Sequence, residues 1–297
     1  MLPACLDSLG AQRPTLPAEV WVVDNASTDD SREMVRARYP WVKLIASERN
    51  LGFAGANNLA AARAAGRYLL LLNPDTIVPE GALNALAQFA EANPQAAAVG
   101  PRLLNADGSW QRSAWRGYPG LAMALSDALY LWKLPGLPLA RLSEYLPGEL
   151  AQAREVDHLL GACLLIRRAA WDQVGGLDDR FFLFLEETDW CFRARQQGWR
   201  VMYTPEVSLT HLGEHSMNQN PRRNLPEFYR SYCQFYRKHA GPGRWRGGAL
   251  KAIIALAALV RLGLWQWRQT RRTGAEQAQA RAMQAGYVSV LRQLASF

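Results

Sequence analysis

The chain contains few cysteines and none of the cysteine patterns that hold metal ions or build disulfide frameworks. Its four cysteines, Cys5, Cys163, Cys191 and Cys233, are far apart in 297 residues and form no CxxC motif or Cys-His pair. We therefore expect reduced, mostly buried thiols and a reducing compartment. No signal peptide is visible at the N-terminus, so we expect a cytoplasmic protein.

Two motifs that would indicate other functions are also absent. A nicotinamide-dependent oxidoreductase needs a GxGxxG turn after its first strand, but Asp24-Asn25 stands at that place. An HExxH zinc site is excluded as well, although His211 and His215 are four residues apart. Gly213 between them favours a loop, and we expect one histidine to act singly beside a carboxylate.

Long apolar runs are scarce, and the excess of positive charge is confined to one end. Residues 241–297 hold nine of the 34 basic residues and one of the 26 acidic residues, so the rest of the chain is neutral. The longest uncharged apolar run there, Ala252–Val260, is too short to span a bilayer but suits a helix in the membrane interface. We expect the tryptophan-rich segment 245–267 to lie on a membrane surface. The alternative is a helix docked on the globular part.

The rest of the composition is that of a compact soluble enzyme with additions. Hydrophobic residues make up 49% of the chain and charged residues 20%. A basic tail without interleaved stacking motifs is a weak signal for nucleic acid, so we expect no nucleic-acid partner.

The most informative segment is Gly66–Asp75. Five apolar residues in a row, Tyr68–Leu72, are typical of a strand buried on both faces, and the run ends at Asn73-Pro74-Asp75. A carboxylate at the C-terminal edge of such a strand lies where open α/β sheets bind ligands. For this segment alone, a simple Pro-Asp turn is the alternative.

Two earlier apolar runs end in polar residues in the same way, at residues 19–23 and 42–46. The polar ends Asp24, Asn50 and Asp75 are therefore 26 and 25 residues apart, which is the spacing of βαβ units. The crossover helices are predicted at residues 29–38 and 59–65. Right-handed crossovers would bring the three polar ends to one edge of a parallel sheet, facing a common crevice.

A second acidic cluster follows an aromatic stretch. The run Phe181–Leu185 leads into Glu186, Glu187 and Asp189, so three carboxylates fall within four residues. Burial beside apolar groups and a neighbouring like charge both raise a carboxyl pKa, which favours a proton acceptor tuned toward neutral pH. The alternative is the acidic first turn of a helix, stabilised by the helix dipole.

Seven short motifs follow one another between residues 2 and 216. They are Asp24-Asn25-x-Ser27-x-Asp29, Asn50-x-Gly52-Phe53-x-Gly55-x-Asn57-Asn58, Asn73-Pro74-Asp75, Asp107-Gly108-Ser109-x-Gln111-x-Ser113, Gly161 to Arg168, Gly175-Gly176-Leu177-Asp178-x-x-Phe181-Phe182 and Glu186-Glu187-x-Asp189-Trp190. Each motif is weak alone. In this order they resemble the family 2 glycosyltransferases, and within them the rhamnosyltransferase-like branch that builds bacterial surface polysaccharides.

The resemblance implies a GT-A fold in residues 1–240, a Rossmann-like, mostly parallel sheet flanked by helices. The nucleotide-sugar half is expected at about residues 1–105 and the acceptor half at about 106–240, followed by a basic helical tail in 241–297. The chain begins within the helix that follows the family's first strand. That strand is therefore expected to be missing, which would leave backbone groups of the neighbouring strands unpaired.

The resemblance also implies a role for each polar motif. Donor binding is assigned to Asp24, Asn25, Asn50, Gly52, Phe53, Asn57 and Asn73. Asp75 and His211 are assigned to the Mg²⁺ or Mn²⁺ that bridges the donor diphosphate. Glu187 stands at the position of the catalytic base, usually Asp, and Glu186 and Asp189 are the alternatives. The motifs at 161–168 and 178–182 would form the acceptor side.

The implied reaction is an inverting transfer in which Glu187 removes a proton from the acceptor hydroxyl. The donor would be a nucleoside-diphosphate sugar, with dTDP-rhamnose favoured by the branch, and the acceptor a glycan or lipid-linked glycan on the inner face of the cell membrane. His158 stands where the family often has Trp, which is expected to affect acceptor choice. A non-catalytic nucleotide-sugar binding protein is the alternative, because of the missing strand.

Overall fold

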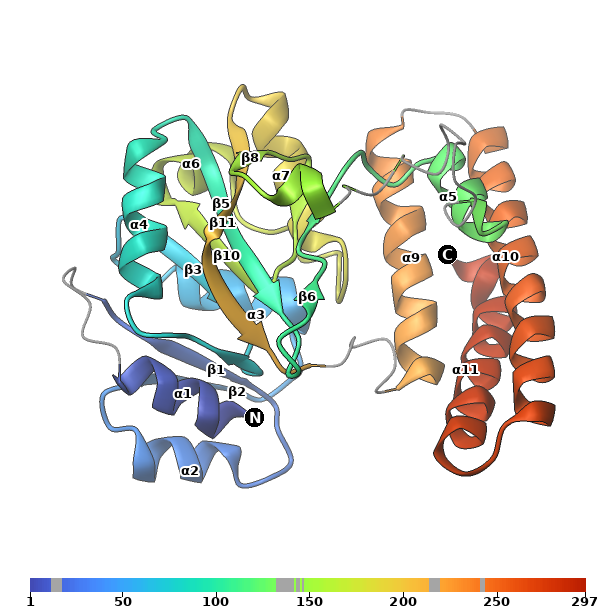
Figure 1. The fold of residues 1–297 in the computed structure, drawn as a ribbon, viewed down its shortest axis with the longest axis horizontal. Coiled ribbons are helices and arrows are strands. Elements are labelled where there is room, and N and C mark those ends of the chain that lie inside the picture. Colours follow the sequence, from blue (N-terminus) through green and yellow to red (C-terminus); the bar gives the residue numbers. More distant parts are fainter. Residues whose placement is uncertain (12–17, 132–141, 143–144, 146, 214–219, 241–243) are drawn as a thin grey trace. The chain divides into compact units, whose positions relative to one another are not determined.

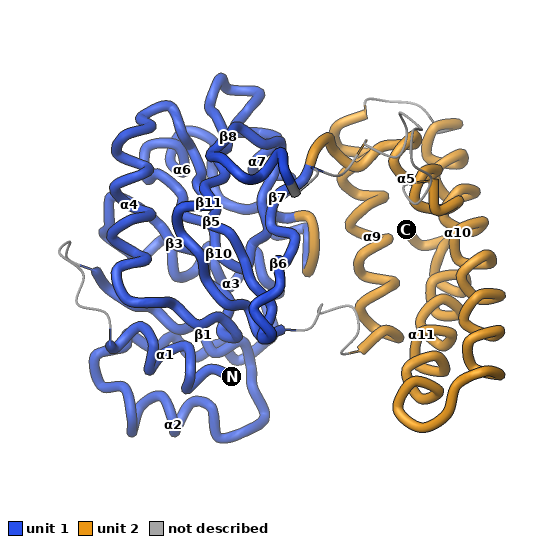
Figure 2. The backbone as a smooth tube through the Cα atoms, in the orientation of Figure 1, with its two compact units in different colours: residues 1–115, 145–182, 186–213 blue, residues 116–144, 183–185, 214–297 orange. Residues whose placement is uncertain are grey.

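The computed structural model describes residues 1–11, 18–131, 142, 145, 147–213, 220–240 and 244–297. The chain divides into two compact units (Figure 2). Unit 1 consists of residues 1–115, 145–182 and 186–213, and unit 2 of residues 116–144, 183–185 and 214–297. Each unit is described by itself.

Unit 1 begins with the predicted βαβ pattern (Figure 1). The elements are α1 (Leu2–Ala11), β1 (Trp21–Asn25), α2 (Ser31–Arg38), β2 (Lys43–Ser47), α3 (Gly52–Ala61) and β3 (Tyr68–Leu72). Strands β1 and β2 pair in parallel, with Asn25 opposite Ser47. Helices α1 and α2 cover this pair through a small core in which Leu6 and Val35 are almost fully buried.

The other strands of unit 1 form a mixed seven-stranded sheet. Its order is β3, β10 (Cys163–Arg167), β5 (Ala96–Leu104), β11 (Arg200–His211) and β4 (Thr76–Ile77), with β6 (Trp110–Gln111) beside β5 and β8 (Arg154–Glu155) beside β11. Strand β11 runs parallel to β5, and β10 runs antiparallel to both its neighbours.

One sequence-based expectation is corrected by this topology. In the described residues, β1 and β3 belong to separate sheets, so the three polar strand ends are not carried by one continuous parallel sheet. The physical reason is that β3 hydrogen-bonds to the antiparallel strand β10, with Leu70 opposite Leu165, and no ladder joins it to β1.

The prediction that β3 is buried on both faces is met only in part, because Leu69 and Leu71 are buried whereas the alternate residues of the strand are half-buried. Leu69 and Leu71 enter a core with α6 (Arg168–Val174) and α7 (Glu186–Gln196), whereas Leu70 packs against a second core that includes α4 (Ala82–Ala92). All four cysteines are buried and free. The remaining short elements of unit 1 are β7 (Ala114–Trp115), β9 (His158–Leu159) and the 3₁₀ turn Pro147–Leu150.

Unit 2 is helical and has its own core. Its elements are α5 (Leu121–Ala128), α9 (Pro221–His239), α10 (Arg244–Arg271), α11 (Gly274–Gln293) and a last 3₁₀ turn, Leu294–Ser296. Tyr232 of α9, Ile254 of α10 and Tyr287 of α11 are buried together. The boundary at residue 240 proposed from the sequence therefore differs from this division, because the aromatic face of α9 packs with α10 and α11.

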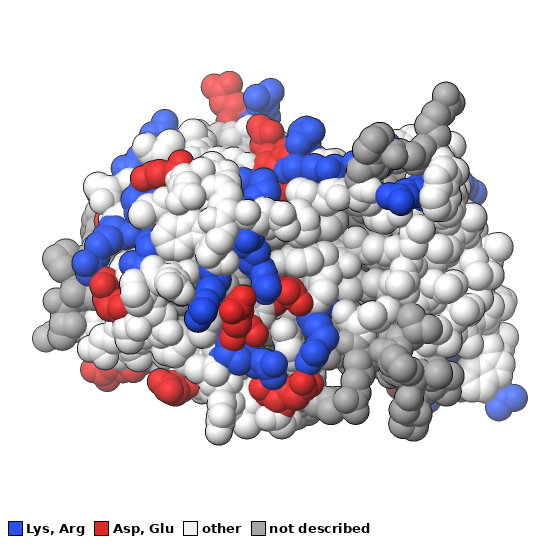
Figure 3. Space-filling view, turned by 90° about the horizontal axis from the view of Figure 1, so that it is seen from above, with Lys and Arg blue, Asp and Glu red and all other residues white. Residues whose placement is uncertain are grey.

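The surface charge of unit 1 agrees with the neutral composition of that part of the chain. On the face shown in Figure 3, Lys and Arg side chains alternate with Asp and Glu over unit 1 without a large patch of one sign. The part of unit 2 that is visible there is mostly uncharged. Among the described residues on this face there is no large patch of positive charge of the kind that attracts a polyanionic partner.

Candidate active site

The structure brings Asp75 and His211 together at the end of the seven-stranded sheet. Strand β4 pairs with β11 so that His211 lies opposite Thr76, and the Leu212 amide donates to the Asp75 carbonyl at 2.7 Å. As a result, His211 Nε2 is 3.1 Å from Asp75 Oδ1. His215 lies outside the described residues.

These two side chains have the features of a pair of metal ligands. Asp75 Oδ1 is buried and has no assigned hydrogen-bond partner among the described residues. Burial raises the pKa of Asp75, but its interaction with His211 outweighs burial, so the net shift is downward. A spacing of 3.1 Å is close to the ~3.0 Å between adjacent ligands of an octahedral ion with bonds of about 2.1 Å. No third His, Cys, Asp or Glu gathers with them in the described ranges. The set therefore suits an ion that takes its other ligands from substrate phosphates.

Gly213 leaves room for the Asp75 carboxylate. A Cβ atom at this position would lie 2.1 Å from Asp75 Oδ2, a distance that no side chain can accept. Any other residue would displace the carboxylate. Gly213 lies two residues after His211, the last residue of β11, and only this closeness in the sequence could have indicated its role.

A second polar group forms where β1 and β2 end. Asn25 Nδ2 donates to Asn50 Oδ1 at 3.1 Å and to the Gly52 carbonyl at 3.0 Å, and Asn25 Oδ1 accepts from the Leu51 amide at 2.6 Å. Gly52 has a φ of 72°, which favours glycine. Asn25, Asn50 and Gly52 thus form one hydrogen-bonded corner, and their assignment to donor binding remains a prediction.

Asp24 is held as a carboxylate beside this corner. It is buried and paired with Arg32 Nε, and Oδ1 accepts from the Ser27 amide at 3.3 Å. Burial raises the pKa of Asp24, but the hydrogen bonds from Ser27 and Arg32 outweigh it, so the net shift is downward. Arg32 was not predicted as a site residue; it is the second residue of α2, the helix that follows Asp24 in the sequence.

Phe53 and Asn57 lie in α3, which corrects a boundary. The sequence-based helix began at residue 59, but α3 begins at Gly52 because Asn25 and Asn50 bond the backbone there. Asn57 Nδ2 donates to the Phe53 carbonyl at 2.9 Å, within the helix. Asn57 therefore lies within α3, before the helix boundary predicted from the sequence.

The segment Gly161-Ala162 links the acidic cluster to the Asp75 turn. The Asn73 amide donates to the Ala162 carbonyl at 2.9 Å. A Cβ added to Gly161 would lie 3.3 Å from Phe53 Cζ and 3.7 Å from Glu187 Cγ, so the Phe53 ring and Glu187 flank this glycine. Phe53, Asn73 and Glu187, predicted from three separate motifs, are thus neighbours of one dipeptide.

Glu186 and Glu187 are the first two residues of α7 and are both perturbed. Burial raises the pKa of Glu187 to about 7, and backbone N–H groups only partly oppose it. Burial and then the charge of Glu187 raise the pKa of Glu186 well above its usual range. Each side chain has a buried Oε2 without a hydrogen-bond partner among the described residues. The residues before them, Phe184 and Leu185, have φ values of 69° and 67°.

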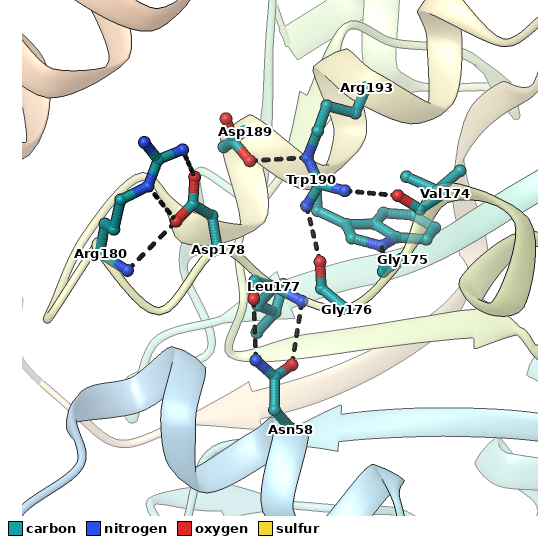
Figure 4. Close-up of polar contacts among 10 residues, drawn as sticks. All are labelled: Asn58, Val174, Gly175, Gly176, Leu177, Asp178, Arg180, Asp189, Trp190 and Arg193. Carbon is teal, nitrogen blue, oxygen red and sulfur yellow. Dashed lines mark hydrogen bonds and ion pairs between the residues drawn. The ribbon is translucent and has the colours of Figure 1, made fainter.

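Asp189 is engaged differently from the two glutamates. It is fully buried, and Arg193 Nε donates to its Oδ2 at 2.8 Å (Figure 4). Arg193 also donates to the carbonyls of Val174 at 2.8 Å and Gly176 at 2.7 Å. Asp189 and Arg193 therefore join α7 to the segment 174–176.

Asn58 of α3 binds Leu177, the residue that follows this segment. Its Nδ2 donates to the Leu177 carbonyl at 2.8 Å, and its Oδ1 accepts from the Leu177 amide at 2.9 Å (Figure 4). The Phe53 amide donates to the Phe182 carbonyl at 2.9 Å. Helix α3 is therefore bonded at two points to the chain that leads into α7. Asn58 and Arg193 were not predicted as site residues, although Asn58 lies within a quoted motif.

His158 is a buried neutral side chain. Its ring stacks on Trp115, with centroids 5.3 Å apart, and Nδ1 lies 3.2 Å from Thr188 Oγ1. Burial lowers the pKa of His158 to about 3. It therefore contributes no charge near neutral pH, and its influence on acceptor choice remains a prediction.

Comparison with known proteins identifies the family of the chain. The model of "Glycosyl transferase family 2" matches residues 1–174. The chain is 33% identical over 286 residues to N-acetylglucosaminyl-diphospho-decaprenol L-rhamnosyltransferase of Mycobacterium tuberculosis H37Rv, covering 89% of each chain. It is 25% identical over 171 residues to rhamnosyltransferase WbbL of Escherichia coli K12, covering 55% of this chain and 62% of that one.

Solved structures share the fold. Mannosyltransferase PcManGT from Pyrobaculum calidifontis, in complex with GDP-Man and Mn²⁺, aligns with a TM-score of 0.53 and 16% identity, over 99% of this chain and 83% of its own. GalNAc-T7 with UDP, GalNAc and Mn²⁺ aligns with a TM-score of 0.51 and 16% identity, over 76% of this chain and 45% of its own.

The family model and the relatives define a sugar-transferring enzyme, and the solved structures show its GT-A fold. The chain belongs to glycosyltransferase family 2, and its relatives include rhamnosyltransferases. The family and the fold expected from the seven motifs are thereby confirmed.

Proposed function

We propose that this glycosyltransferase moves a sugar from a nucleoside diphosphate to a hydroxyl group with inversion, using Glu187 as the base. The supporting observation is the Glu187 carboxyl itself. It is shielded, has an unpartnered Oε2, and lies beside the Gly161-Ala162 segment that holds the Asn73 turn. A carboxyl with a pKa of about 7 can accept a proton near neutral pH.

Donor binding is assigned to the corner at the ends of β1 and β2 and to the Asp75 turn. Asn25, Asn50 and Gly52 would hold the nucleoside, and Asn73 would contact the diphosphate. Asp75 and His211 would hold Mg²⁺ or Mn²⁺, as the buried, unpartnered Asp75 Oδ1 and its distance of 3.1 Å from His211 Nε2 suggest. When bound, the ion supplies positive charge that stabilises the departing diphosphate.

The transfer is a single displacement. The acceptor oxygen forms a bond to the anomeric carbon while the bond from that carbon to the diphosphate oxygen breaks. Glu187 takes the acceptor proton, and the leaving nucleoside diphosphate keeps the electron pair of the broken bond. Because attack comes from the face opposite the leaving group, the anomeric configuration inverts.

The donor and acceptor are inferred from the relatives. The Mycobacterium relative is named as an L-rhamnosyltransferase acting on N-acetylglucosaminyl-diphospho-decaprenol, and the Escherichia coli relative is a rhamnosyltransferase. We therefore propose dTDP-rhamnose as the donor and a lipid-linked glycan as the acceptor.

The metal assignment is tested by measuring dTDP binding with and without Mn²⁺. We expect Mn²⁺ to strengthen dTDP binding to the wild type and to have no such effect on Asp75→Ala. The control is Asp172→Ala, which removes an exposed carboxylate of α6 and should behave as the wild type. If Mn²⁺ strengthens dTDP binding to Asp75→Ala as much as to the wild type, the ion binds at another site.

We further propose that the enzyme binds the membrane surface through α10. Among the described helices, α10 has the length and composition to cross a membrane, with 28% of its most apolar stretch buried. Two cations, Lys251 and Arg261, lie within the apolar sequence of α10. Lys251 Nζ donates to the Ala295 carbonyl, and Arg261 is buried and donates to the Asp127 carboxylate.

The outer face of α10 is apolar from end to end. Trp245, Leu259 and Trp267 are 70%, 57% and 55% exposed, and Leu256 and Leu264 are also exposed. This face extends over about 33 Å. Arg246 and Arg271 lie over the Trp245 and Trp267 rings at the two ends. Because the inner face packs within unit 2, we propose that α10 lies in the plane of the interface rather than across the bilayer.

A further inference from the structure

A chain of side-chain hydrogen bonds leads from the surface of unit 1 to His211. His211 Nδ1 is 2.8 Å from Gln111 Oε1, and Gln111 Nε2 donates to Asn105 Oδ1 at 3.1 Å. Asn105 Nδ2 donates to Ser109 Oγ at 2.9 Å, and Ser109 Oγ donates to Asp107 Oδ1 at 2.5 Å. Asp107, Ser109 and Gln111 belong to the motif to which the family resemblance gave no role, and Asn105 lies two residues before it.

The local fold explains why these residues meet. Strand β5 ends at Leu104, and the chain turns back so that β6 pairs with β5, Gln111 lying opposite Leu103. The turn is closed by the Asn105 amide donating to the Ser109 carbonyl at 2.8 Å, and Gly108 adopts a φ of 79° within it. On its other edge, β5 pairs with β11, which ends at His211.

The carboxylate of Asp107, at the surface end of this series of hydrogen bonds, determines which group donates in each bond. Hydrogen bonds from the Ser109 side chain and amide lower the pKa of Asp107, so it is ionised at neutral pH. An ionised carboxylate can only accept. The Ser109 hydroxyl must therefore donate to Asp107, which leaves Ser109 Oγ to accept from the Asn105 amide group.

The same argument continues to the histidine. Asn105 Oδ1 accepts from Gln111 Nε2, so Gln111 presents Oε1 to His211. Gln111 Oε1 is an acceptor only, and the proton of this contact must lie on His211 Nδ1. Gln111 and His211 are each 7% exposed, so water has little access to replace this contact.

We infer that the chain Asp107-Ser109-Asn105-Gln111, here called the Asp107 relay, holds His211 as the tautomer with its proton on Nδ1. Nε2 is then an unprotonated ligand atom 3.1 Å from Asp75 Oδ1. Two acceptors this close repel each other unless a cation lies between them. Asn73 Nδ2, 3.4 Å from Nε2, is a donor and is compatible with this tautomer. Gln111 is therefore a positioning residue for the metal ligand.

This inference rests on the proposed metal site, but the tautomer is measured without metal. The chain has four histidines, so ¹⁵N–¹H correlation spectra of the full-length protein at pH 8 can be assigned by comparison with His211→Gln. We expect His211 to show a protonated Nδ1 and an unprotonated Nε2. In Gln111→Met we expect a mixture of tautomers, and in Gln111→Glu, which keeps an acceptor toward Nδ1, the wild-type pattern.

Metal affinity is the second measurement. Titration of Mn²⁺ in the presence of dTDP should give about 10- to 100-fold weaker binding for Gln111→Met, with most of the affinity restored in Gln111→Glu. Ser113→Ala is the control. This substitution removes the hydrogen bond from Ser113 Oγ to the Pro101 carbonyl in the same segment, but Ser113 is not part of the relay. Should Gln111→Met fail to fold, Ser109→Ala, in the exposed turn, interrupts the same chain.

The possible outcomes separate the two claims. A wild type that binds no Mn²⁺ with dTDP would overturn the metal site of the proposed function, and with it the purpose of the relay. A wild type that binds Mn²⁺ but carries its His211 proton on Nε2 would overturn the relay alone. Gln111→Met with unchanged tautomer and unchanged Mn²⁺ affinity would do the same.

Discussion

At the scale of single residues, the carboxyl pair at the start of α7 combines a functional advantage with a cost in stability. Glu186 and Glu187 are shielded beside each other, and burial raises the pKa of both. The folded state therefore binds a proton more tightly than the unfolded chain does. The contribution of Glu187 to stability is complete below its ordinary pKa of 4.5 and is lost as the pH rises through about 7.

Replacing Glu187 with Gln should therefore stabilise the fold in a pH-dependent way. We expect the free energy of unfolding of Glu187→Gln to match that of the wild type near pH 4.5 and to exceed it by roughly 1 to 3 kcal/mol at pH 8. Urea denaturation at the two pH values measures this difference. A difference that does not change with pH would mean that Glu187 is ionised throughout and is not shielded.

At the scale of elements, α3 and the chain entering α7 are held as one frame. Gly52 is central to it, because a Cβ there would lie 2.3 Å from the Phe182 carbonyl oxygen, and its φ is positive. The Asn58 bonds to Leu177 continue the frame. Through it, the corner assigned to donor binding and the helix that begins with Glu187 are positioned together.

Gly52→Ala tests this frame. We expect a loss of more than about 2 kcal/mol in stability, from left-handed strain together with displacement of Phe182, and weaker dTDP binding. Gly81→Ala is a matched control, because Gly81 has a φ of 77° but nothing within 4 Å of an added Cβ. It should lose only about 1 kcal/mol and bind dTDP normally. Equal effects of the two substitutions would show that contact with Phe182 is unimportant.

The elements also show how far sequence reasoning reaches. Apolar runs and their spacing predicted β1, β2 and β3 and the helices between them, because local hydrophobic pattern governs these elements. The separation of β1 from β3 was not predictable, since it depends on the pairing of β3 with the distant strand β10. Most site residues lay in quoted motifs. Arg32 and Arg193 were missed because their roles arise from packing partners that the sequence does not reveal.

At the scale of the whole molecule, the helices after residue 220 build a unit with its own core. Deleting residues 245–297 would uncover the buried face of α9, so a loss of membrane binding in such a truncation could reflect misfolding. Substitutions confined to the exposed face of α10 avoid this ambiguity.

Leu256→Glu/Leu259→Glu should impair membrane binding without unfolding unit 2, because both side chains are exposed. We expect co-sedimentation with phosphatidylglycerol-containing vesicles to fall by more than about tenfold. Ala275→Glu/Ala278→Glu makes the same change of charge on exposed positions of α11 and serves as the control. If both double variants lose binding equally, charge alone is responsible, and α10 does not insert.

The central claim is that Glu187 is the base of an inverting, metal-dependent transfer. The most direct test measures transfer of rhamnose from dTDP-rhamnose to an N-acetylglucosaminyl-diphospho-polyprenol by the wild type, Glu187→Gln and Glu186→Gln, together with donor affinity. We predict an inverted product from the wild type, and from Glu187→Gln a rate lower by about 10² to 10⁴ with unchanged donor affinity. Wild-type turnover by Glu187→Gln would contradict the account, and its loss in Glu186→Gln alone would move the base to that residue.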